Sequence, residues 1–207
     1  MNRPQDTKAP KHPWWHWRGE WARTAAVLLL LGVFRASFAN HYVVPSGSME
    51  PTLEPGDRVL VDMRAHGWRI PMTTLHLTQG QPVQRGEVVI FDSPRDGVRL
   101  IKRVVAVGGD TVEVRDGHLR INGQWLSNGR GSEERFAART ATLDLDDGGG
   151  PDVASMQVPQ GQLLMMGDHR GNSLDGRYFG LVPEDKVYGR ATAVFWRSGH
   201  AFVWKAL

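Results

Sequence analysis

The sequence predicts a mainly antiparallel β domain that follows one N-terminal apolar helix. Glycine accounts for 24 and proline for 12 of the 207 residues, so tight turns should be frequent. After residue 40, short runs rich in β-branched residues are bounded by glycine, proline or aspartate, and no long segment has the 3.6-residue apolar period of a helix. Before residue 40, an uncharged apolar run follows a basic segment.

The β domain is expected to occupy residues 40–207. The segment VEVRDGHLRI has Asp116 and Gly117 between two alternating runs, which is a strong hairpin signal. From about residue 122 to 159 the strand pattern weakens and glycines are frequent, which predicts a smaller β insertion with a flexible glycine-rich loop. The expected strands are Arg58–Met63, Glu87–Asp92, Leu100–Val107, Thr111–Arg115, His118–Ile121, Gln162–Met166 and Val187–Trp196.

The first 40 residues have the pattern of a membrane anchor. Residues 1–20 form a basic, tryptophan-rich tail, and residues 21–39 include the uncharged run TAAVLLLLGVF. The segment from Trp21 to Phe38 would form about 27 Å of helix, just short of the roughly 30 Å hydrocarbon core. It can cross a bilayer if the residues at its ends assist.

The charges around this segment predict its orientation. Arg23 and Arg35 lie near its ends and can extend to the lipid headgroups. Basic residues precede the helix and none lies between Arg35 and Pro45, which predicts a single-pass anchor with a cytoplasmic N-terminus and an exported body. Two alternatives remain open: a cleaved secretory signal, with Ser37 and Ala39 as the small residues before the cut, and a core helix of a soluble protein.

The composition excludes several kinds of chemistry. The chain has no cysteine, so a disulfide, a thiolate metal site and a thiol redox site are all impossible. It lacks H-E-x-x-H or a comparable ligand spacing and has no phosphate-binding or dinucleotide-binding glycine motif, so we expect no metal and no cofactor. The net charge is +3, but the basic residues are spread along the chain, so nucleic acid is not an expected partner.

Two segments contain a candidate nucleophile and a candidate base. PSGSMEPTLEPGD concentrates small and turn-forming residues, and a Ser-Gly-Ser turn can expose a hydroxyl and free backbone N–H groups for an oxyanion. In RLIKRVVAVGGD, the period of two places Lys102 on the same strand face as Leu100 and Val104. Desolvation there would lower the pKa of the lysine from about 10.4, and a base near neutrality needs a shift of roughly two to three units.

A third segment, MGDHRGNSLDGRYFGLVPED, begins at the end of an apolar strand. Ser173 could hydrogen-bond and orient a neutral lysine, and Asp175 with Arg177 could form a charge-assisted brace. Each of these features taken alone has an ordinary structural interpretation, as a loop, a strand lysine that extends to solvent, or a turn. No histidine belongs to a motif that fits a Ser-His-Asp triad, and His169 is the one worth testing.

In this order behind an apolar segment, PSGSMEPTL, LIKRVVAVGGD and GDHRGNSLDGRYFGLVP resemble the type I signal peptidases of bacteria. The resemblance implies a signal-peptidase-like antiparallel β catalytic domain, held in the inner membrane with its active site on the periplasmic side. It implies a serine endopeptidase in which Ser48 is the nucleophile and Lys102 the general base. Ser46 would join the Ser48 amide in the oxyanion hole, and Ser173 would orient the lysine.

The resemblance also implies the partners of the enzyme and how a substrate binds. Asp175 and Arg177 would support the site. An exported preprotein would lie as an added strand and present small residues, at the first and third positions before the cut, to two shallow pockets. The other implied partner is the phospholipid membrane. The implied substrate-binding residues are Tyr42, Val44, Pro45, Met49, Leu100 and Ile101.

The third segment departs from the family pattern, which is closer to GDNRDNS followed by DSR. His169, Gly171 and Gly176 are the departures, and they leave the serine and lysine unchanged. They point to a specialised member, such as a peptidase for conjugation pilin precursors. Two interpretations from other classes remain: a self-cleaving Ser-Lys repressor, whose DNA-binding module the N-terminus does not resemble, and an inactive membrane-tethered β scaffold.

Overall fold

The computed structural model describes residues 15–38, 40–67, 80–128, 131–197, 199 and 202–207. The chain divides into two units, 1–36 and 37–207. The N-terminal helix that the sequence predicts is present as α1 (Trp15–Phe38). Within the part of the chain that the structure describes, no helix combines the length and the apolar character needed to cross a membrane.

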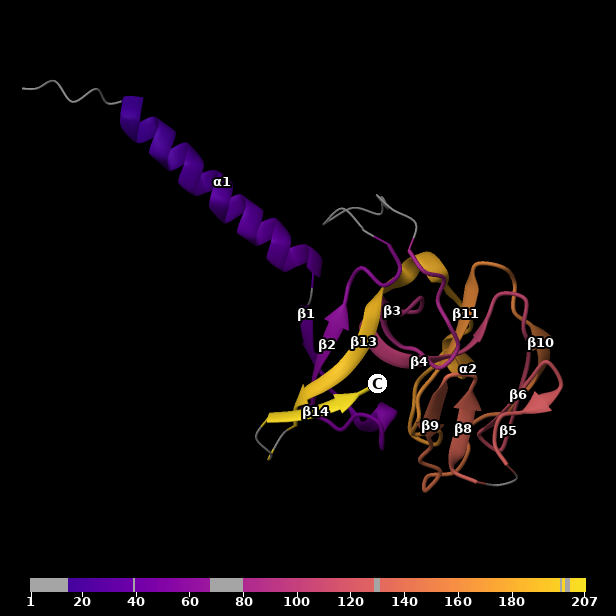
Figure 1. Cartoon of the computed structure of the whole chain (residues 1–207). Helices are drawn as coiled ribbons and strands as arrows, with labels where there is room; N and C mark the ends of the chain where they lie inside the picture. The colour runs from indigo at the N-terminus through magenta and orange to yellow at the C-terminus, as the bar shows by residue number, and fades with distance from the viewer. Residues whose placement is uncertain (1–14, 39, 68–79, 129–130, 198, 200–201) are drawn as a thin grey trace, which may run out of the picture. The chain divides into compact units, whose positions relative to one another are not determined.

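The second unit is built mainly from antiparallel strands, as predicted. Its larger sheet has the strand order β1-β2-β13-β3-β4-β11-β12, with β14 paired to the long strand β13 (Figure 1). In β3 and β4 most residues are buried, because both faces of the sheet are covered there. The strands of this sheet are β1 (Asn40–Val43), β2 (Arg58–Asp62), β3 (Val88–Asp92), β4 (Arg99–Val107), β11 (Gln162–Met166), β12 (Val182–Pro183), β13 (Val187–Trp196) and β14 (Phe202–Ala206).

A smaller sheet has the strand order β10-β5-β6-β7, and β8 and β9 form a separate hairpin. Asp116 and Gly117 form the predicted turn between β5 and β6, with φ of 48° and 79°, the positive values of a type I′ turn. This sheet begins at Thr111, earlier than the predicted insertion, because β5 and β6 pair with strands inside it. The strands are β5 (Thr111–Arg115), β6 (His118–Ile121), β7 (Gln124–Trp125), β8 (Glu133–Phe136), β9 (Arg139–Thr142) and β10 (Val153–Gln157).

The two sheets share one apolar core. Val105 and Ala106 of β4 pack with Leu164 and Met166 of β11 in the same cluster as the buried residues of the smaller sheet. The smaller sheet is therefore packed against β4, the strand that carries the candidate base, and against its neighbour β11. Three short helical turns complete the described part of this unit: η1 (Gly47–Met49), α2 (Gly176–Phe179) and η2 (Glu184–Lys186).

Candidate active site

Ser48 lies in the turn η1, between β1 and β2. The next residue, Met49, is fully buried in an apolar cluster, and this burial anchors the turn to the sheet. The backbone amide of Glu50 donates to the carbonyl oxygen of Gly47 at 2.9 Å, and the amide of His169 donates to the carbonyl oxygen of Ser48 at 3.3 Å. The backbone around the candidate nucleophile is therefore fixed both within the turn and by the loop after β11.

Lys102 lies in β4 and is only 3% exposed. Its Nζ is hydrogen-bonded to Ser48 Oγ. Leu100 and Val104, on the same strand face, belong to one apolar cluster, in keeping with the dry setting that the sequence predicts. Burial lowers the pKa of Lys102 from 10.5 to about 8, with a further decrease from Arg177 and an opposing increase from nearby carboxylates. Near pH 8 a large fraction of this amine is thus neutral and able to accept a proton.

Asp175 and Arg177 form an ion pair whose two side chains are both fully buried. Asp175 also accepts a hydrogen bond from the backbone amide of Gly167 at 3.0 Å. Arg177 donates to the carbonyl oxygens of Gly149 and Arg170 at 2.6 and 2.7 Å. This pair, which the sequence proposed as a brace, therefore ties the loop after β11 to the glycine-rich loop of the smaller sheet.

A second buried ion pair was missed by the sequence reasoning. Arg103 Nη2 lies 2.6 Å from Asp168 Oδ2, and both side chains are buried. The hydroxyl of Thr52 donates to the same oxygen at 2.6 Å. Thr52, Arg103 and Asp168 each lie in one of the three segments that contain the candidate site residues. Their position in these segments was the sequence signal that could have predicted their contact. Their bonds connect the nucleophile loop, β4 and the loop after β11.

The structure places Ser46 beside the nucleophile, but it does not give Ser173 the contact that the sequence predicts. Ser46 Oγ hydrogen-bonds Ser48 Oγ at 3.4 Å, so it lies beside the nucleophile. Ser173 Oγ is buried with no hydrogen-bond partner among the described residues, so it does not bond Lys102 in this structure. A Cβ atom added at Gly167 would lie 2.3 Å from both Ser173 Oγ and the carbonyl oxygen of Ser48. Only glycine allows the loop after β11 to approach the nucleophile this closely.

Gly167→Ala is therefore expected to displace the backbone of Ser48 and to reduce kcat by about 100-fold, because a shift of about 1 Å in a catalytic group has that effect. The measurement is kcat on a leader-peptide substrate, with thermal unfolding of the same sample. The matched control is Gly131→Ala, since a Cβ atom there would meet, among the described residues, only the carbonyl oxygen of Asn128, at 3.5 Å. Equal kcat for the two variants would show that this close approach does not position Ser48.

The predicted substrate-binding residues fall into three groups. Most of them pack in a single apolar cluster that also contains Val59 and Val61 of β2. Leu100 packs in a different cluster, because neighbouring residues of a strand point to opposite faces. Pro45 is exposed. The residues that share the first cluster are Tyr42, Val44, Met49 and Ile101.

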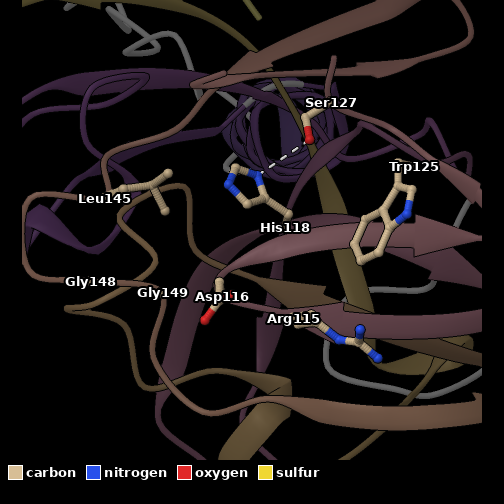
Figure 2. Close-up of a pocket in the computed structure, with 8 residues that line it drawn as sticks. All are labelled: Arg115, Asp116, His118, Trp125, Ser127, Leu145, Gly148 and Gly149. Carbon is tan, nitrogen blue, oxygen red and sulfur yellow. Dashed lines mark hydrogen bonds between the residues drawn. The ribbon is translucent and has the colours of Figure 1, made fainter. Parts of the chain in front are cut away.

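A separate cavity of about 740 Å³ lies in the smaller sheet (Figure 2). His118 and Ser127, on its wall, are hydrogen-bonded at 3.3 Å. None of its lining residues is a candidate catalytic residue, although Arg177 donates to the carbonyl oxygen of Gly149 on its wall. The lining residues are Arg115, Asp116, His118, Trp125, Ser127, Leu145, Gly148 and Gly149.

A serine hydroxyl bonded to a buried amine of lowered pKa, on a mainly β scaffold, is the arrangement of a serine endopeptidase with a lysine base. A family model described as "Signal peptidase, peptidase S26" matches residues 18–196. The chain belongs to this signal peptidase family.

Curated relatives agree with the family match. A probable signal peptidase I-2 from Synechocystis sp. is 34% identical, over 83% of this chain and 69% of its own length. A signal peptidase I from Pseudomonas fluorescens is 34% identical, with coverage of 82% and 69%. One from Bacillus licheniformis is 32% identical, with coverage of 85% and 87%. A solved signal peptidase I from Enterococcus faecalis aligns at 34% identity with 54% of this chain and 98% of that chain, with a TM-score of 0.40.

Proposed function

We propose that this chain is a serine endopeptidase that removes N-terminal signal peptides from exported preproteins. The observation that carries the proposal is the hydrogen bond between Lys102 Nζ and Ser48 Oγ, in a setting where burial lowers the pKa of Lys102 to about 8. The relatives named signal peptidase I support the substrate class.

In the proposed mechanism, neutral Lys102 accepts the Ser48 proton while Ser48 Oγ attacks the carbonyl carbon of the scissile bond. The carbon–nitrogen bond then breaks as the Lys102 ammonium returns this proton to the leaving amine. A water molecule, deprotonated by the same lysine, hydrolyses the acyl-enzyme and releases the signal peptide. The Ser46 hydroxyl and the Ser48 amide donate hydrogen bonds to the oxyanion.

The proposed substrate lies in an extended conformation beside β1 and the start of β4. Val44, Met49 and Ile101 pack in one buried apolar cluster with Tyr42, and this cluster supports the proposal of shallow apolar contacts that favour small residues at the first and third positions before the cut. Tyr42, Pro45 and Leu100 complete the proposed contacts. The departures at His169, Gly171 and Gly176 support a specialised member of the family.

We further propose that residues 21–39 anchor the protein in the inner membrane, with the tail 1–20 in the cytoplasm and residues 40–207 outside it. The uncharged run between Arg23 and Arg35 supports the anchor, and the basic residues before it support the orientation. A body on that side would meet preproteins as they emerge from export.

A cleavage assay with the full chain in detergent tests the proposed function. A preprotein whose signal peptide ends in Ala-x-Ala is incubated with the protein, and the N-terminus of the product is determined by mass spectrometry. We expect a single cut after the last alanine and no cut in a precursor with phenylalanine at that position. No cleavage, while a known signal peptidase cuts the same precursor in parallel, would refute the function.

The pH dependence of kcat/KM follows from the protonation of Lys102. Its pKa is lowered to about 8, and only the neutral amine can act as the base. Below pH 8 the rate should therefore rise about tenfold for each pH unit, and above pH 8 it should level off. Initial rates at low substrate concentration between pH 6 and 10 give this profile for the free enzyme. A flat profile across this range would exclude Lys102 as the base.

A further inference from the structure

Glu50, Asp144 and His169 come from three separate segments and meet beside η1. Each can present one ligand atom, and these three atoms lie within 4.8 Å of one another. The sequence predicts no metal site, because these residues are far apart along the chain and have no local ligand spacing. Only the folded chain brings them together.

The imidazole of His169 is oriented as a metal ligand would be. Its side chain is only 9% exposed, and Nε2 lies 3.0 Å from Asp147 Oδ2. Nδ1 is buried without a hydrogen-bond partner in the part of the chain that the structure describes, and it lies 3.6 Å from Glu50 Oε2. A proton on Nε2, bonded to Asp147, leaves the lone pair of Nδ1 directed at the carboxylate of Glu50. Histidines that bind metals commonly donate their other ring N–H to a carboxylate in this way.

The backbone holds this cluster in place. Asp144 and His169 form an isolated parallel bridge, in which the amide of Arg170 donates to the carbonyl oxygen of Asp144 at 2.9 Å. A Cβ atom at Gly171 would lie 2.2 Å from the carbonyl oxygen of Asp147, so glycine at this position is what lets the Asp147 loop approach. His169 and Gly171, two of the residues that depart from the family pattern, thus both contribute to this cluster.

The charge of the cluster favours a cation. Among the described residues, the ion pairs of Glu50, Asp144 and Asp147 all go to His169. Three carboxylates around one imidazole leave an excess of negative charge, which a divalent ion would neutralise. This excess and the unpartnered Nδ1 are two independent indications of a bound ion.

We propose that Glu50, Asp144 and His169 bind a divalent transition-metal ion, with Zn²⁺ as the preferred ion and Asp147 orienting the imidazole. Imidazole and carboxylate are both ligands of Zn²⁺, and bonds of about 2.0–2.2 Å in a tetrahedron place ligand atoms about 3.3 Å apart. The 3.6 Å between Nδ1 and Glu50 Oε2 requires only a small closure, whereas Asp144, whose Oδ1 lies 3.9 Å from Nε2 of the same ring, must turn towards Nδ1. Ca²⁺ and Mg²⁺ require more oxygen ligands and bind more weakly.

The proposed ion would stiffen the turn that carries Ser48. Glu50 lies two residues after Ser48, and a Cβ atom at Gly47 would lie 2.7 Å from Glu50 Oε2. The amide of His169 donates to the carbonyl oxygen of Ser48 at 3.3 Å. An ion held by both residues therefore connects the nucleophile turn to the Asp144 segment. The binding is independent of the proposed peptidase activity, so it is tested without a cleavage assay.

Titration of the full chain in detergent with Zn²⁺ alone, followed by calorimetry and thermal unfolding, tests the site. We expect the unchanged chain to bind Zn²⁺ with a rise in Tm, and His169→Asn to bind it at least about 100-fold more weakly at this site, with no rise. His118→Asn, which removes a histidine from the smaller sheet, is the matched control and should bind Zn²⁺ like the unchanged chain.

Glu50→Gln is the second variant, because the partly exposed Glu50 side chain can be changed with little effect on folding. This variant should also weaken Zn²⁺ binding. If His169→Asn does not fold, Glu50→Gln alone tests whether the cluster binds Zn²⁺. Ca²⁺ and Mg²⁺ titrations should show far weaker binding than Zn²⁺. Equal Zn²⁺ affinity and equal Tm shifts for the unchanged chain and Glu50→Gln, or the absence of Zn²⁺ binding to the unchanged chain, would overturn the proposal.

Discussion

Replacing Ser48 with alanine, or Lys102 with methionine, is expected to lower kcat/KM for an Ala-x-Ala precursor by about 10⁴-fold or more. Each change removes one partner of the Lys102–Ser48 hydrogen bond, and neither group can act alone. Because the two act as a unit, the double variant should be no slower than either single variant. The measurement is single-turnover cleavage with enzyme in excess. A single variant that retains a tenth of the normal rate would contradict the dyad.

The stability of Lys102→Met distinguishes lost catalysis from lost folding. The folded-state pKa is lowered from 10.5 to about 8, so at neutral pH burial of this lysine opposes folding by about 3 kcal/mol. This penalty is fully present below pH 8 and disappears as the pH rises towards 10.5. Methionine avoids it, so urea unfolding at pH 7 should show equal or greater stability. A large loss of stability would make the kinetic result uninformative.

Asp175→Asn is expected to destabilise the fold by about 3–5 kcal/mol, because it leaves the buried guanidinium of Arg177 without its counter-charge. It should also lower the pKa of Lys102 further, since the negative charge of Asp175 raises that pKa and Arg177 lowers it. Urea unfolding measures the first effect. The acidic limb of the kcat/KM profile, moved to lower pH, measures the second where the variant is folded.

Asp92→Asn is the matched control for this result. It breaks the ion pair of Asp92 with Arg99, in which both side chains are more than a third exposed, so the expected loss is below about 1 kcal/mol. Equal losses for the two aspartates would mean that the buried pair contributes no more than a surface pair, and Asp175 would then have no special structural role.

The parts of the fold that the sequence predicted best are those with a strong local signal. Thr111–Arg115 and His118–Ile121 were predicted with their correct bounds, because the Asp-Gly turn fixes the register of this hairpin. Gln162–Met166 and Val187–Trp196 were also correct, since each is a β-rich run bounded by turn residues. The pairing of Ser48 with Lys102 was predicted from the family resemblance, and no local pattern of either residue required it.

The rest depends on contacts between distant segments. The short strands β7, β8, β9 and β10 have little apolar alternation, and their pairing partners determine them. The ion pair between Arg103 and Asp168 joins residues 65 positions apart. That Ser173 Oγ lacks a hydrogen-bond partner among the described residues could not be predicted either, because the close approach at Gly167 decides where its hydroxyl lies. The same holds for the carboxylates around His169.

The protonation of Lys102 is the property on which the proposed mechanism depends most directly. A ¹⁵N NMR titration of its Nζ, in the full chain in detergent and assigned with Lys102→Met, measures it. A midpoint close to pH 8 is expected, from the burial of the amine beside Ser48. A midpoint near the ordinary value of 10.5 would mean that the amine stays charged at working pH and that it cannot be the base.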